Sequence, residues 1–432
     1  MGALSRILDR YDADRLLRHS LLVIVFTNLG SATNLLFHMI MGRLLSEASY
    51  AILASMLGVY LIFTTPTLAL QNTLAHFSAH LKQEGRGGDI RRLARGWFSK
   101  LSLILLPVVA VALLLSPVWR AGLHLDGLSP VILVIFMVAL SYYLPIYVGS
   151  LQGVQAFTSM CLTGNIWAVL RIISAVALVM AFGAYAVFGL LGHLLGLTLS
   201  LLAGALLFAK IIPRSGATDL PLERTDRYLM QSMMALFSFS ILMTGDVVLV
   251  KMLFPAETDY GPYSRASTIA RVLIFLSQPI ANALFPKVIS RGERSSEHTG
   301  TLWKAIALST VIIGAAVVFC VALPRIPLLL LYHVTEPDAR LILMVRSVSV
   351  AMAPLGLAYI LLNFEMAQHR FTAIPYLMVS AAALIIGALL FHGNLRQFVI
   401  VYALAAYAAA AGILYAATRP DRRTGFGPPS GQ

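Results

Sequence analysis

Charged residues are scarce in this chain, and their scarcity indicates its class. Of the 432 residues, only 12% are charged and 59% are apolar. A soluble domain carries about 25% charged and roughly 45–50% apolar residues. The chain therefore lacks the charge that would cover a soluble surface of this size, and we predict that lipid solvates most of it.

Cysteines, metal-ligand spacings and nucleotide loops are also rare or missing. The two cysteines, Cys161 and Cys320, lie far apart in or beside apolar segments. We expect isolated thiols that pack as small apolar side chains. No glycine-rich loop of the GxxxxGK[ST] kind occurs in the sequence, which argues against direct ATP hydrolysis. The sequence predicts no metal site, no cofactor and no catalytic residue.

Long apolar runs fill most of the chain. A spanning helix needs roughly 20 apolar residues, and a run of this length satisfies its own backbone hydrogen bonds as a helix. We predict an all-α integral membrane protein of about twelve transmembrane helices. The expected spans cover residues 19–42, 49–73, 99–117, 130–152, 164–183, 187–209, 228–254, 262–286, 301–322, 339–363, 372–392 and 397–417.

The distribution of Lys and Arg predicts the orientation of these spans. With the N-terminus in the cytoplasm, the cytoplasmic segments hold 22 Lys and Arg residues and the opposite segments hold five. Positively charged loops stay inside, so we expect both termini in the cytoplasm and a bacterial inner-membrane location. The bias accounts for most of the net charge of +13 without nucleic acid as a partner.

The two halves of the chain repeat each other. Matches at an offset of 210 residues join Glu47 to Glu257, Tyr50 to Tyr260, Asn72 to Asn282 and Leu74 to Leu284, and QAFT at 155–158 recurs as HRFT at 369–372. Two six-helix bundles of the same orientation imply a pseudo-twofold axis along the membrane normal. We expect bundles at 1–210 and 227–418, a cytoplasmic linker at 211–226 and a disordered cytoplasmic tail at 419–432.

Ionisable residues inside the predicted spans are candidate site residues, because a buried charge in lipid is costly. Five are basic and two are acidic, so the interior is net cationic. They are Arg171, Asp246, Lys251, Arg265, Arg271, Arg346 and Glu365.

The depth of each ionisable residue suggests a role. Asp246 and Arg271 lie at matching depth on consecutive spans, and two interpretations stay open. Either they form a structural ion pair, or Arg271 faces a central cavity while Asp246 tunes it or carries a coupling proton. Arg346 has no neighbouring acid and is a cavity candidate.

The remaining ionisable residues lie nearer the ends of their spans. Lys251 and Arg265 either line the cavity or extend to the interface. Arg171 and Glu365 are candidates for a cytoplasmic gate, although Arg171 could equally reach the interface and Glu365 could be interfacial. We interpret His38, His193 and Asn34 as packing residues that bond neighbouring helices.

A net-cationic cavity suits an anionic substrate, because the planar donors of Arg match phosphate oxygens. Three strings of the sequence resemble one transporter family. They are GRLLSEASYAIL at Gly42–Leu53, GDVVLVKMLFPAETDYGPYSRAST at Gly245–Thr268 and LSQPIANALFPKVI at Leu276–Ile289. Together with twelve spans, they resemble the oligosaccharide flippases of bacterial envelope polysaccharide synthesis. That family belongs to the multidrug/oligosaccharidyl-lipid/polysaccharide exporter superfamily.

The resemblance implies two six-helix bundles around a central cavity, as in the multidrug and toxin extrusion proteins. It implies transfer of an undecaprenyl-diphosphate-linked oligosaccharide, such as a lipopolysaccharide precursor, from the inner to the outer leaflet. The driving force would be a proton or sodium gradient, and other membrane proteins of polysaccharide assembly would be partners. Arg271 and Arg346, followed by Arg265 and Lys251, match the basic cavity of that family. The first two spans depart from it, because they carry no deep Arg or Lys.

Two other functions remain as alternatives. A drug exporter of the multidrug and toxin extrusion family would share the fold, but its cationic cargo would call for more acids than bases in the membrane. A membrane-embedded polysaccharide polymerase or ligase would need an outer catalytic site. The outer loops offer His124 with Asp126, or His333 with Glu336 and Asp338, which could serve acid–base chemistry.

Overall fold

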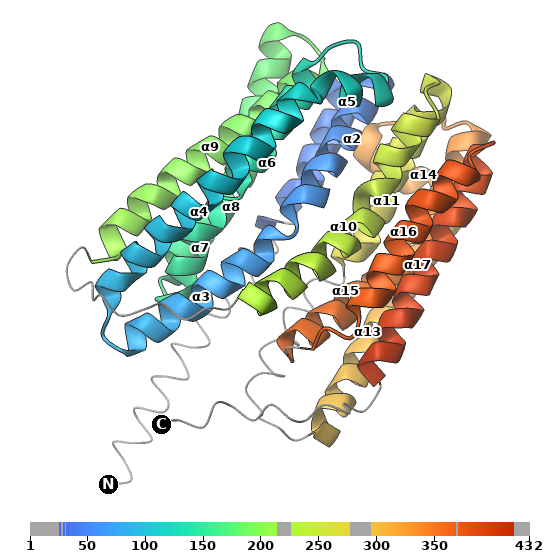
Figure 1. The fold of residues 1–432 in the computed structure, drawn as a ribbon. Coiled ribbons are helices and arrows are strands. Elements are labelled where there is room, and N and C mark those ends of the chain that lie inside the picture. The colour runs from blue at the N-terminus through green and yellow to red at the C-terminus, as the bar shows by residue number, and fades with distance from the viewer. Residues whose placement is uncertain are drawn as a thin grey trace.

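A computed structural model describes residues 26, 29–30, 32–213, 226–276, 295–368 and 370–418. Every regular element among these residues is a helix (Figure 1). A helix at 32–44 opens the first half. It is followed by α2 (Glu47–Thr64), α3 (Thr67–Gln83), α4 (Gly87–Leu114), α5 (Ser116–Gly122), α6 (Ser129–Ser141), α7 (Leu144–Gly153), α8 (Phe157–Phe182) and α9 (Ala186–Ile211).

The second half has a similar order of helices. It contains α10 (Asp226–Leu253), α11 (Glu257–Phe275), α13 (Ser295–Ala322), α14 (Arg325–Tyr332), α15 (Ala339–Ala367), α16 (Ile374–Leu390) and α17 (Leu395–Thr418). Where its residues are described, each predicted span lies on one of these helices or on the helix at 32–44, except that the spans 49–73, 99–117 and 130–152 each include parts of two helices. Among the described residues, eight helices are long and apolar enough to cross a membrane, or nine if α13 and α14, bent by 90°, are one broken span.

The sequence repeat is visible in the order of the helices. α2 begins at Glu47 and α11 begins at Glu257, so their starts are offset by 210 residues. The starts of α6 and α15 have the same offset, and α4 and α13 are each followed by a short helix, α5 or α14. Asn282, Leu284 and His369, which complete the sequence matches, lie outside the described residues, as does most of the expected linker and the tail.

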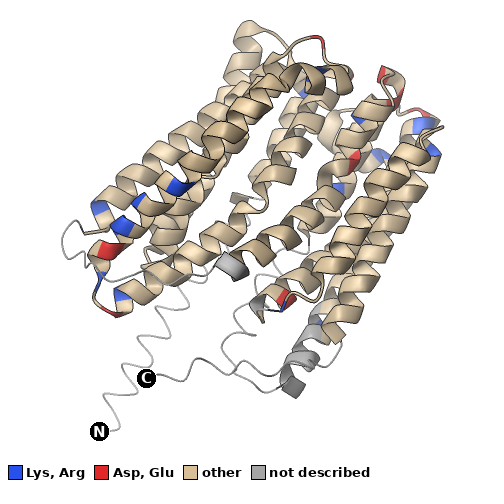
Figure 2. Ribbon diagram, viewed as in Figure 1, with Lys and Arg blue, Asp and Glu red and all other residues tan. Residues whose placement is uncertain are grey.

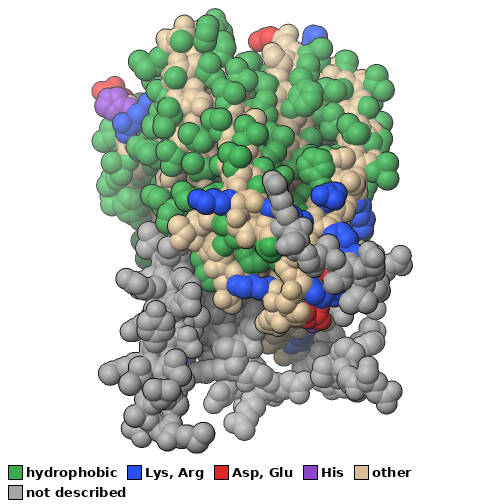
Figure 3. Space-filling model, turned by 90° about the vertical axis from the view of Figure 1, so that its left-hand side faces the viewer, with side chains coloured by type: hydrophobic (Ala, Val, Ile, Leu, Met, Phe, Trp, Pro, Cys, Tyr) green, Lys and Arg blue, Asp and Glu red, His purple; other side chains and the backbone are tan. Residues whose placement is uncertain are grey.

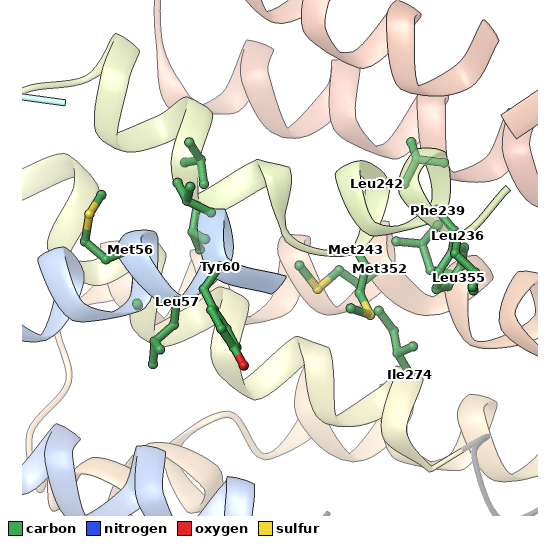
Figure 4. Packing of buried hydrophobic residues seen from close by; sticks show 14 of the residues in the cluster. Met56, Leu57, Tyr60, Leu236, Phe239, Leu242, Met243, Ile274, Met352 and Leu355 are labelled. Atoms are coloured by element: carbon green, nitrogen blue, oxygen red, sulfur yellow. The ribbon is translucent and has the colours of Figure 1, made fainter. Parts of the chain in front are cut away.

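The described helices pack as two lobes (Figure 1). We call residues 32–213 the N-lobe and residues 226–418 the C-lobe. Within the N-lobe, α8 packs on α9 and α3 on α7, while in the C-lobe α15 packs on α11, α13 and α17. Between the lobes, α2 contacts α10 and α11, and α3 contacts α10. Hydrophobic side chains of α2, such as Met56, and of α10, such as Phe239, belong to one continuous core (Figure 4).

Small residues allow α8 and α9 to pack closely. Gly192, Gly196, Ser200 and Gly204 follow one another at four-residue spacing along α9. A Cβ at Gly192 would lie 2.4 Å from the backbone nitrogen of Ala175. Because lipid provides no hydrophobic force between helices, close backbone approach of this kind stabilises membrane bundles. This row of small residues on α9 holds α8 and α9 close together, and both helices carry side chains into the interior of the N-lobe.

Charged residues lie mainly at the two ends of the helices (Figure 2). The ends of α3 and α4 form a basic end that includes Lys82, Arg86 and Arg91. The side of the molecule seen in Figure 3 is largely apolar above and carries Lys and Arg below. This pattern fits a multi-pass membrane protein, whose apolar band faces lipid. The described cysteines, Cys161 and Cys320, are both buried and free, which confirms the interpretation as isolated thiols.

The prolines inside the apolar spans differ in their effect. Pro145 follows a real break between α6 and α7 and begins the second helix. Pro107 and Pro354 lie inside α4 and α15, which continue past them. Pro279 lies outside the described residues. A further break, which the sequence analysis did not predict, separates α2 from α3 at Thr65 and Pro66.

Candidate functional site

A buried ion pair joins α10 to α11 in the C-lobe. Nη2 of Arg271 lies 3.1 Å from Oδ1 of Asp246. The other carboxylate oxygen of Asp246 accepts hydrogen bonds from Ser267, at 2.5 Å, and from Tyr263, at 3.2 Å. Arg271 also donates its Nε–H to the carbonyl of Met243. Asp246 is fully buried and Arg271 is only 5% exposed.

These contacts satisfy most of the donors and acceptors of the pair. The sequence leaves two interpretations open for these residues. The structure contains the ion pair between consecutive helices that the first of them describes. A carboxylate that accepts from three donors, one of which is its counter-charge, has few positions left for another ligand. Contact between Arg271 and a substrate, and a coupling role for Asp246, stay predictions.

The lobes are joined at the end opposite to the basic one. Nη1 of Arg265 on α11 lies 3.3 Å from Oε1 of Glu47 on α2. Arg43 donates to the carbonyl of Leu330 on α14. Both contacts cross from the N-lobe to the C-lobe, so Arg265 contributes to closing this end of the interface.

Tyr50 lies at the centre of the same contact region. Its hydroxyl donates to Oγ1 of Thr268 at 3.0 Å and shares a hydrogen bond with the hydroxyl of Tyr332 at 2.9 Å. It also lies 3.1 Å from Nδ1 of His38. Tyr50 is fully buried. One hydroxyl thus connects the N-lobe to two helices of the C-lobe, α11 and α14.

Two glycines allow the lobes to approach closely here. A Cβ at Gly261 would lie 2.6 Å from Cγ of Glu47, and a Cβ at Gly42 would lie 2.3 Å from the ring of Tyr332. We call these contacts, together with those of Arg265 and Tyr50, the interlobe latch. No ligand could pass between the lobes at the latch without separating them.

Below the latch, polar contacts between the lobes become fewer. Thr244 on α10 donates to the carbonyl of Gly58 at 3.3 Å, and Ser240 donates to the carbonyl of Ile62 at 3.0 Å. The rings of Phe63 and Phe237 lie 5.9 Å apart. Within the described part of the chain, the interlobe hydrogen bonds and ion pairs lie between the latch and Ile62.

Lys251 lies in an aromatic site near the same end. It is 2% exposed, and its Nζ lies 3.5 Å from the centroid of the Tyr260 ring. A cation over an aromatic face is stabilised by the ring quadrupole. Both interpretations of Lys251, as a cavity residue and as an interfacial one, stay predictions.

Arg346 and Glu365, both on α15, lie apart from the residues described above. Arg346 is exposed on the same face of the helix as the exposed Leu343 and Val350, and its Nε–H donates to the carbonyl of Val321 on α13. Glu365 is buried near the basic end and accepts a hydrogen bond from Thr372. The structure therefore does not bring Arg346 to Arg271, and a cavity or gate role for either residue of α15 stays a prediction.

Arg171 lies near the middle of α8 and not near its end. α8 begins at Phe157, seven residues before the expected start, so Arg171 lies about 21 Å from that end of the helix. It is 2% exposed. Its Nη2 donates to Oδ1 of Asn34 at 3.1 Å, and its guanidinium carbon lies 4.0 Å from the centroid of Phe37. Arg171 is therefore central in the N-lobe, and a cytoplasmic gate role stays a prediction.

Sequence reasoning did not identify Tyr50, Tyr332, Asn34 and His193 as functional residues. His193 was expected to be a satisfied packing residue, but neither of its ring nitrogens has a hydrogen-bond partner among the described residues. A signal was present in the sequence. Segments 15–46, 48–83, 90–125 and 127–218 contain no Asp or Glu, so a basic residue in an N-lobe span has no carboxylate from those segments.

An apolar pocket of about 140 Å³ lies between α2, α4, α5 and α6. Its lining includes Phe63 of α2, Leu105 of α4, Trp119 of α5 and Val134 of α6. Phe63 also takes part in the interlobe contact with Phe237. The pocket suits a hydrocarbon chain, since its lining is apolar and α4 lies at the apolar outer side of the lobe.

Comparisons with known proteins establish the fold. No protein-family model and no curated protein matches the chain. A multidrug transporter of the multidrug and toxin extrusion (MATE) family, solved in an inward-facing conformation, aligns with a TM-score of 0.70 and 15% identity over 90% of this chain and 93% of its own. The lipid II flippase MurJ aligns with a TM-score of 0.65 and 15% identity over 90% and 86% of the two chains.

A third solved structure has the same architecture. It is a transporter from Pyrococcus furiosus of the multidrug/oligosaccharidyl-lipid/polysaccharide exporter superfamily, and it is described as having a binding pocket of reverse polarity. It aligns with a TM-score of 0.61 and 16% identity over 93% of this chain and 94% of its own. All three are described as transporters or flippases. The predicted all-α, two-lobe membrane architecture is confirmed, and the chain shares the fold of these three proteins.

Proposed function

We propose that this protein transfers an anionic, lipid-linked oligosaccharide across the membrane by alternating access between its two lobes. We propose further that the cargo is an undecaprenyl-diphosphate-linked oligosaccharide for envelope polysaccharide synthesis. It would move from the inner to the outer leaflet of a bacterial inner membrane, driven by a proton or sodium gradient. In this orientation the basic end is cytoplasmic, and the interlobe latch closes the outer side.

The sign of the buried charge carries this proposal. No Asp or Glu occurs in the N-lobe spans after Glu47, as far as Asp219, except for residues near the ends of helices. In the C-lobe, Asp246 is neutralised by Arg271. The other buried cations, Arg171 and Lys251, have no carboxylate within ion-pair distance among the described residues. The buried acids Asp89 and Glu365 lie near helix ends beside Arg86 and Arg370, so the described interior is net cationic and favours an anion.

The shared fold does not select between cargoes, because one fold hosts several functions. The superfamily structures include multidrug transporters and a lipid II flippase. The transporter from Pyrococcus furiosus is described as having reverse polarity in its pocket. Charge is therefore the better criterion, and it favours an anionic cargo over the cationic cargo of a drug exporter. The apolar pocket beside α2 adds a place for a lipid chain.

A translocation assay tests the proposal. The purified protein is placed in liposomes with a fluorescent undecaprenyl-diphosphate oligosaccharide, and we measure how much label becomes accessible on the far side with and without a proton or sodium gradient. We expect gradient-dependent transfer of the lipid-linked sugar and no efflux of a cationic dye. Dye efflux without lipid transfer would favour the drug exporter, and inactivity in both assays would contradict alternating transport of either cargo.

A cross-link across the latch supplies a matched inactive control. In a disulfide, Sγ of one cysteine lies about 3 Å from Cβ of the other. A Cβ at Gly261 would lie 2.6 Å from Cγ of Glu47, the atom that Sγ of a cysteine would replace. We expect Glu47→Cys combined with Gly261→Cys to cross-link under oxidation and block transfer. A reductant should restore activity. Full transfer by the cross-linked protein would refute the latch as a moving gate.

Arg346 provides a separate test of the cavity. Its exposed position beside Leu343 and Val350 resembles that of a residue at the lipid boundary. If Arg346 lines the cavity, as the sequence predicts, Arg346→Ala should insert normally and lose transfer. Normal transfer by this variant would instead indicate that Arg346 lies at the lipid boundary and contributes only its hydrogen bond to the carbonyl of Val321.

A further inference from the structure

The guanidinium of Arg171 lacks a counter-charge in its own lobe. It is 2% exposed, and its Nε has no hydrogen-bond partner among the described residues. Segments 15–46, 48–83, 90–125 and 127–218 contain no acidic residue that could reach it from a neighbouring helix. Burying a charge without a counter-charge is costly in a protein. The guanidinium at this position therefore needs stabilising neighbours or a bound anion.

Aromatic rings stabilise the cation without neutralising it. The guanidinium carbon lies 4.0 Å from the centroid of Phe37 and 4.8 Å from the centroid of Trp167. Cation–π contacts of this kind favour the charged form. They leave the N–H donors of the guanidinium available, and Asn34 accepts from only one of its nitrogens. The net positive charge of the cluster remains.

His193 is a second buried side chain without a hydrogen-bond partner among the described residues, and it lies beside the indole of Trp167. Its ring lies 5.2 Å from Trp167 and 4.7 Å from Tyr60. His193 is 1% exposed, and both ring nitrogens are without a hydrogen-bond partner in the described part of the chain. A neutral imidazole carries one donor and one acceptor, and leaving both unused in a buried site is costly. Such groups mark a place where a ligand or ordered water belongs.

We propose that Arg171, Asn34 and His193 form an anion-binding site in the N-lobe. The Nε–H of Arg171, the amide group of Asn34 and a ring N–H of His193 provide three kinds of donor, and the N-lobe segments around them provide no carboxylate to repel an anion. Asn34 is half-buried, which gives the site a route of access. One positive charge matches a small monovalent anion or a single phosphate group.

The anion could be free in solution or part of an anionic lipid, and both present the same chemistry to the donors. The inference does not depend on the proposed cargo, because binding is measured on the isolated protein without transport. A failed translocation assay would leave this site in place, and a failed binding assay would leave the transport proposal in place.

Trp167 is a natural reporter of binding. The chain contains four tryptophans, and replacing Trp97, Trp119 and Trp303 with Phe leaves Trp167 as the only one. The full-length protein is titrated in nanodiscs with chloride, inorganic phosphate or farnesyl diphosphate, in a gluconate background. We expect a saturable change in Trp167 fluorescence with at least one of these anions. The same anion should raise the midpoint of thermal unfolding.

Substitutions then locate the site. We expect Arg171→Gln to weaken binding roughly tenfold or more, because it removes charge-assisted hydrogen bonds. Arg120→Gln, at an exposed arginine of the same lobe, should bind like the reporter protein. If Arg171→Gln fails to fold, His193→Phe keeps an aromatic ring and should still weaken binding.

Each result of the titration decides the question. Saturation by chloride or phosphate identifies a free-anion site, and saturation by farnesyl diphosphate alone identifies a site for lipid-linked phosphate. No saturable response to any of the three would overturn the proposal. So would unchanged binding in Arg171→Gln and His193→Phe.

Discussion

The ion pair between Asp246 and Arg271 allows the energetic role of a buried charge to be measured. Replacing Asp246 with Leu leaves the guanidinium of Arg271 buried without its counter-charge, and replacing Arg271 with Met leaves the carboxylate unpaired. Breaking a buried pair on one side costs about 3–5 kcal/mol. We expect each single variant to lose free energy of unfolding in this range.

The double variant should be more stable than the sum of the single effects predicts. With both charges removed, the remaining cost comes from the hydroxyls of Ser267 and Tyr263, which lose the acceptor that Asp246 provides. A buried hydroxyl without a partner costs about 1–3 kcal/mol. We therefore expect a loss of about 2–6 kcal/mol for the double variant, against about 6–10 kcal/mol if the two effects were independent.

Unfolding can be followed with the native cysteines. Cys161 lies in the N-lobe and Cys320 in the C-lobe, and both are buried, so a thiol-reactive dye reports the opening of either lobe. Titration with a denaturing detergent in mixed micelles gives the free energy of unfolding for each variant. Ser102→Ala, at a half-buried hydroxyl of the N-lobe, serves as a control for a lost hydroxyl.

Two results would refute this reasoning. The first is a single variant within about 0.5 kcal/mol of wild type, and the second is additivity of the two single effects. Transport assays on the same proteins separate the two sequence-based interpretations. A folded double variant that still transports indicates a structural pair, whereas a stable but inactive one indicates that Arg271 contacts the cargo.

Two further predictions concern the latch and the α8–α9 contact. Tyr50→Phe removes the hydroxyl that both lobes share. It should destabilise the closed latch by about 1–3 kcal/mol, which is measured as slower cross-linking of cysteines at Glu47 and Gly261. Gly192→Leu should lower the free energy of unfolding by at least about 2 kcal/mol, because its Cβ would meet the backbone of α8. The same change at Gly314, which faces open space, should be nearly neutral; equal effects at both glycines would contradict the packing argument.

Predictions about span positions succeeded where apolar length is the signal. Every expected span overlaps described helices, although parts of 19–42 and 262–286 lie outside the described residues, and several helices extend beyond the expected bounds. α4 begins at Gly87 rather than at 99, and α8 begins at Phe157 rather than at 164. Hydropathy detects the part of a helix that lies in lipid, whereas the backbone hydrogen bonds continue into polar segments such as the start of α4. For Arg171, this difference moved the charge from near a helix end to its middle.

Contacts between distant residues could not be predicted from the sequence. Asp246 and Arg271 were paired by depth on consecutive helices, which needs only the rise per residue. Glu47 and Arg265 are separated by more than 200 residues, and their contact depends on the packing of α2 against α11. The convergence of Tyr50, Thr268 and Tyr332 also depends on that packing.

The sequence by itself determined that this is a helical membrane protein, where its spans lie and how its halves repeat, because apolar length and periodic matches are properties of the chain. It also determined that the N-lobe spans are poor in acids. Only the tertiary structure decided which buried cations are neutralised. Arg271 and Arg265 find carboxylates while Arg171 finds Asn34 and aromatic rings, since charge pairing depends on the rotation and distance of packed helices, which composition does not contain.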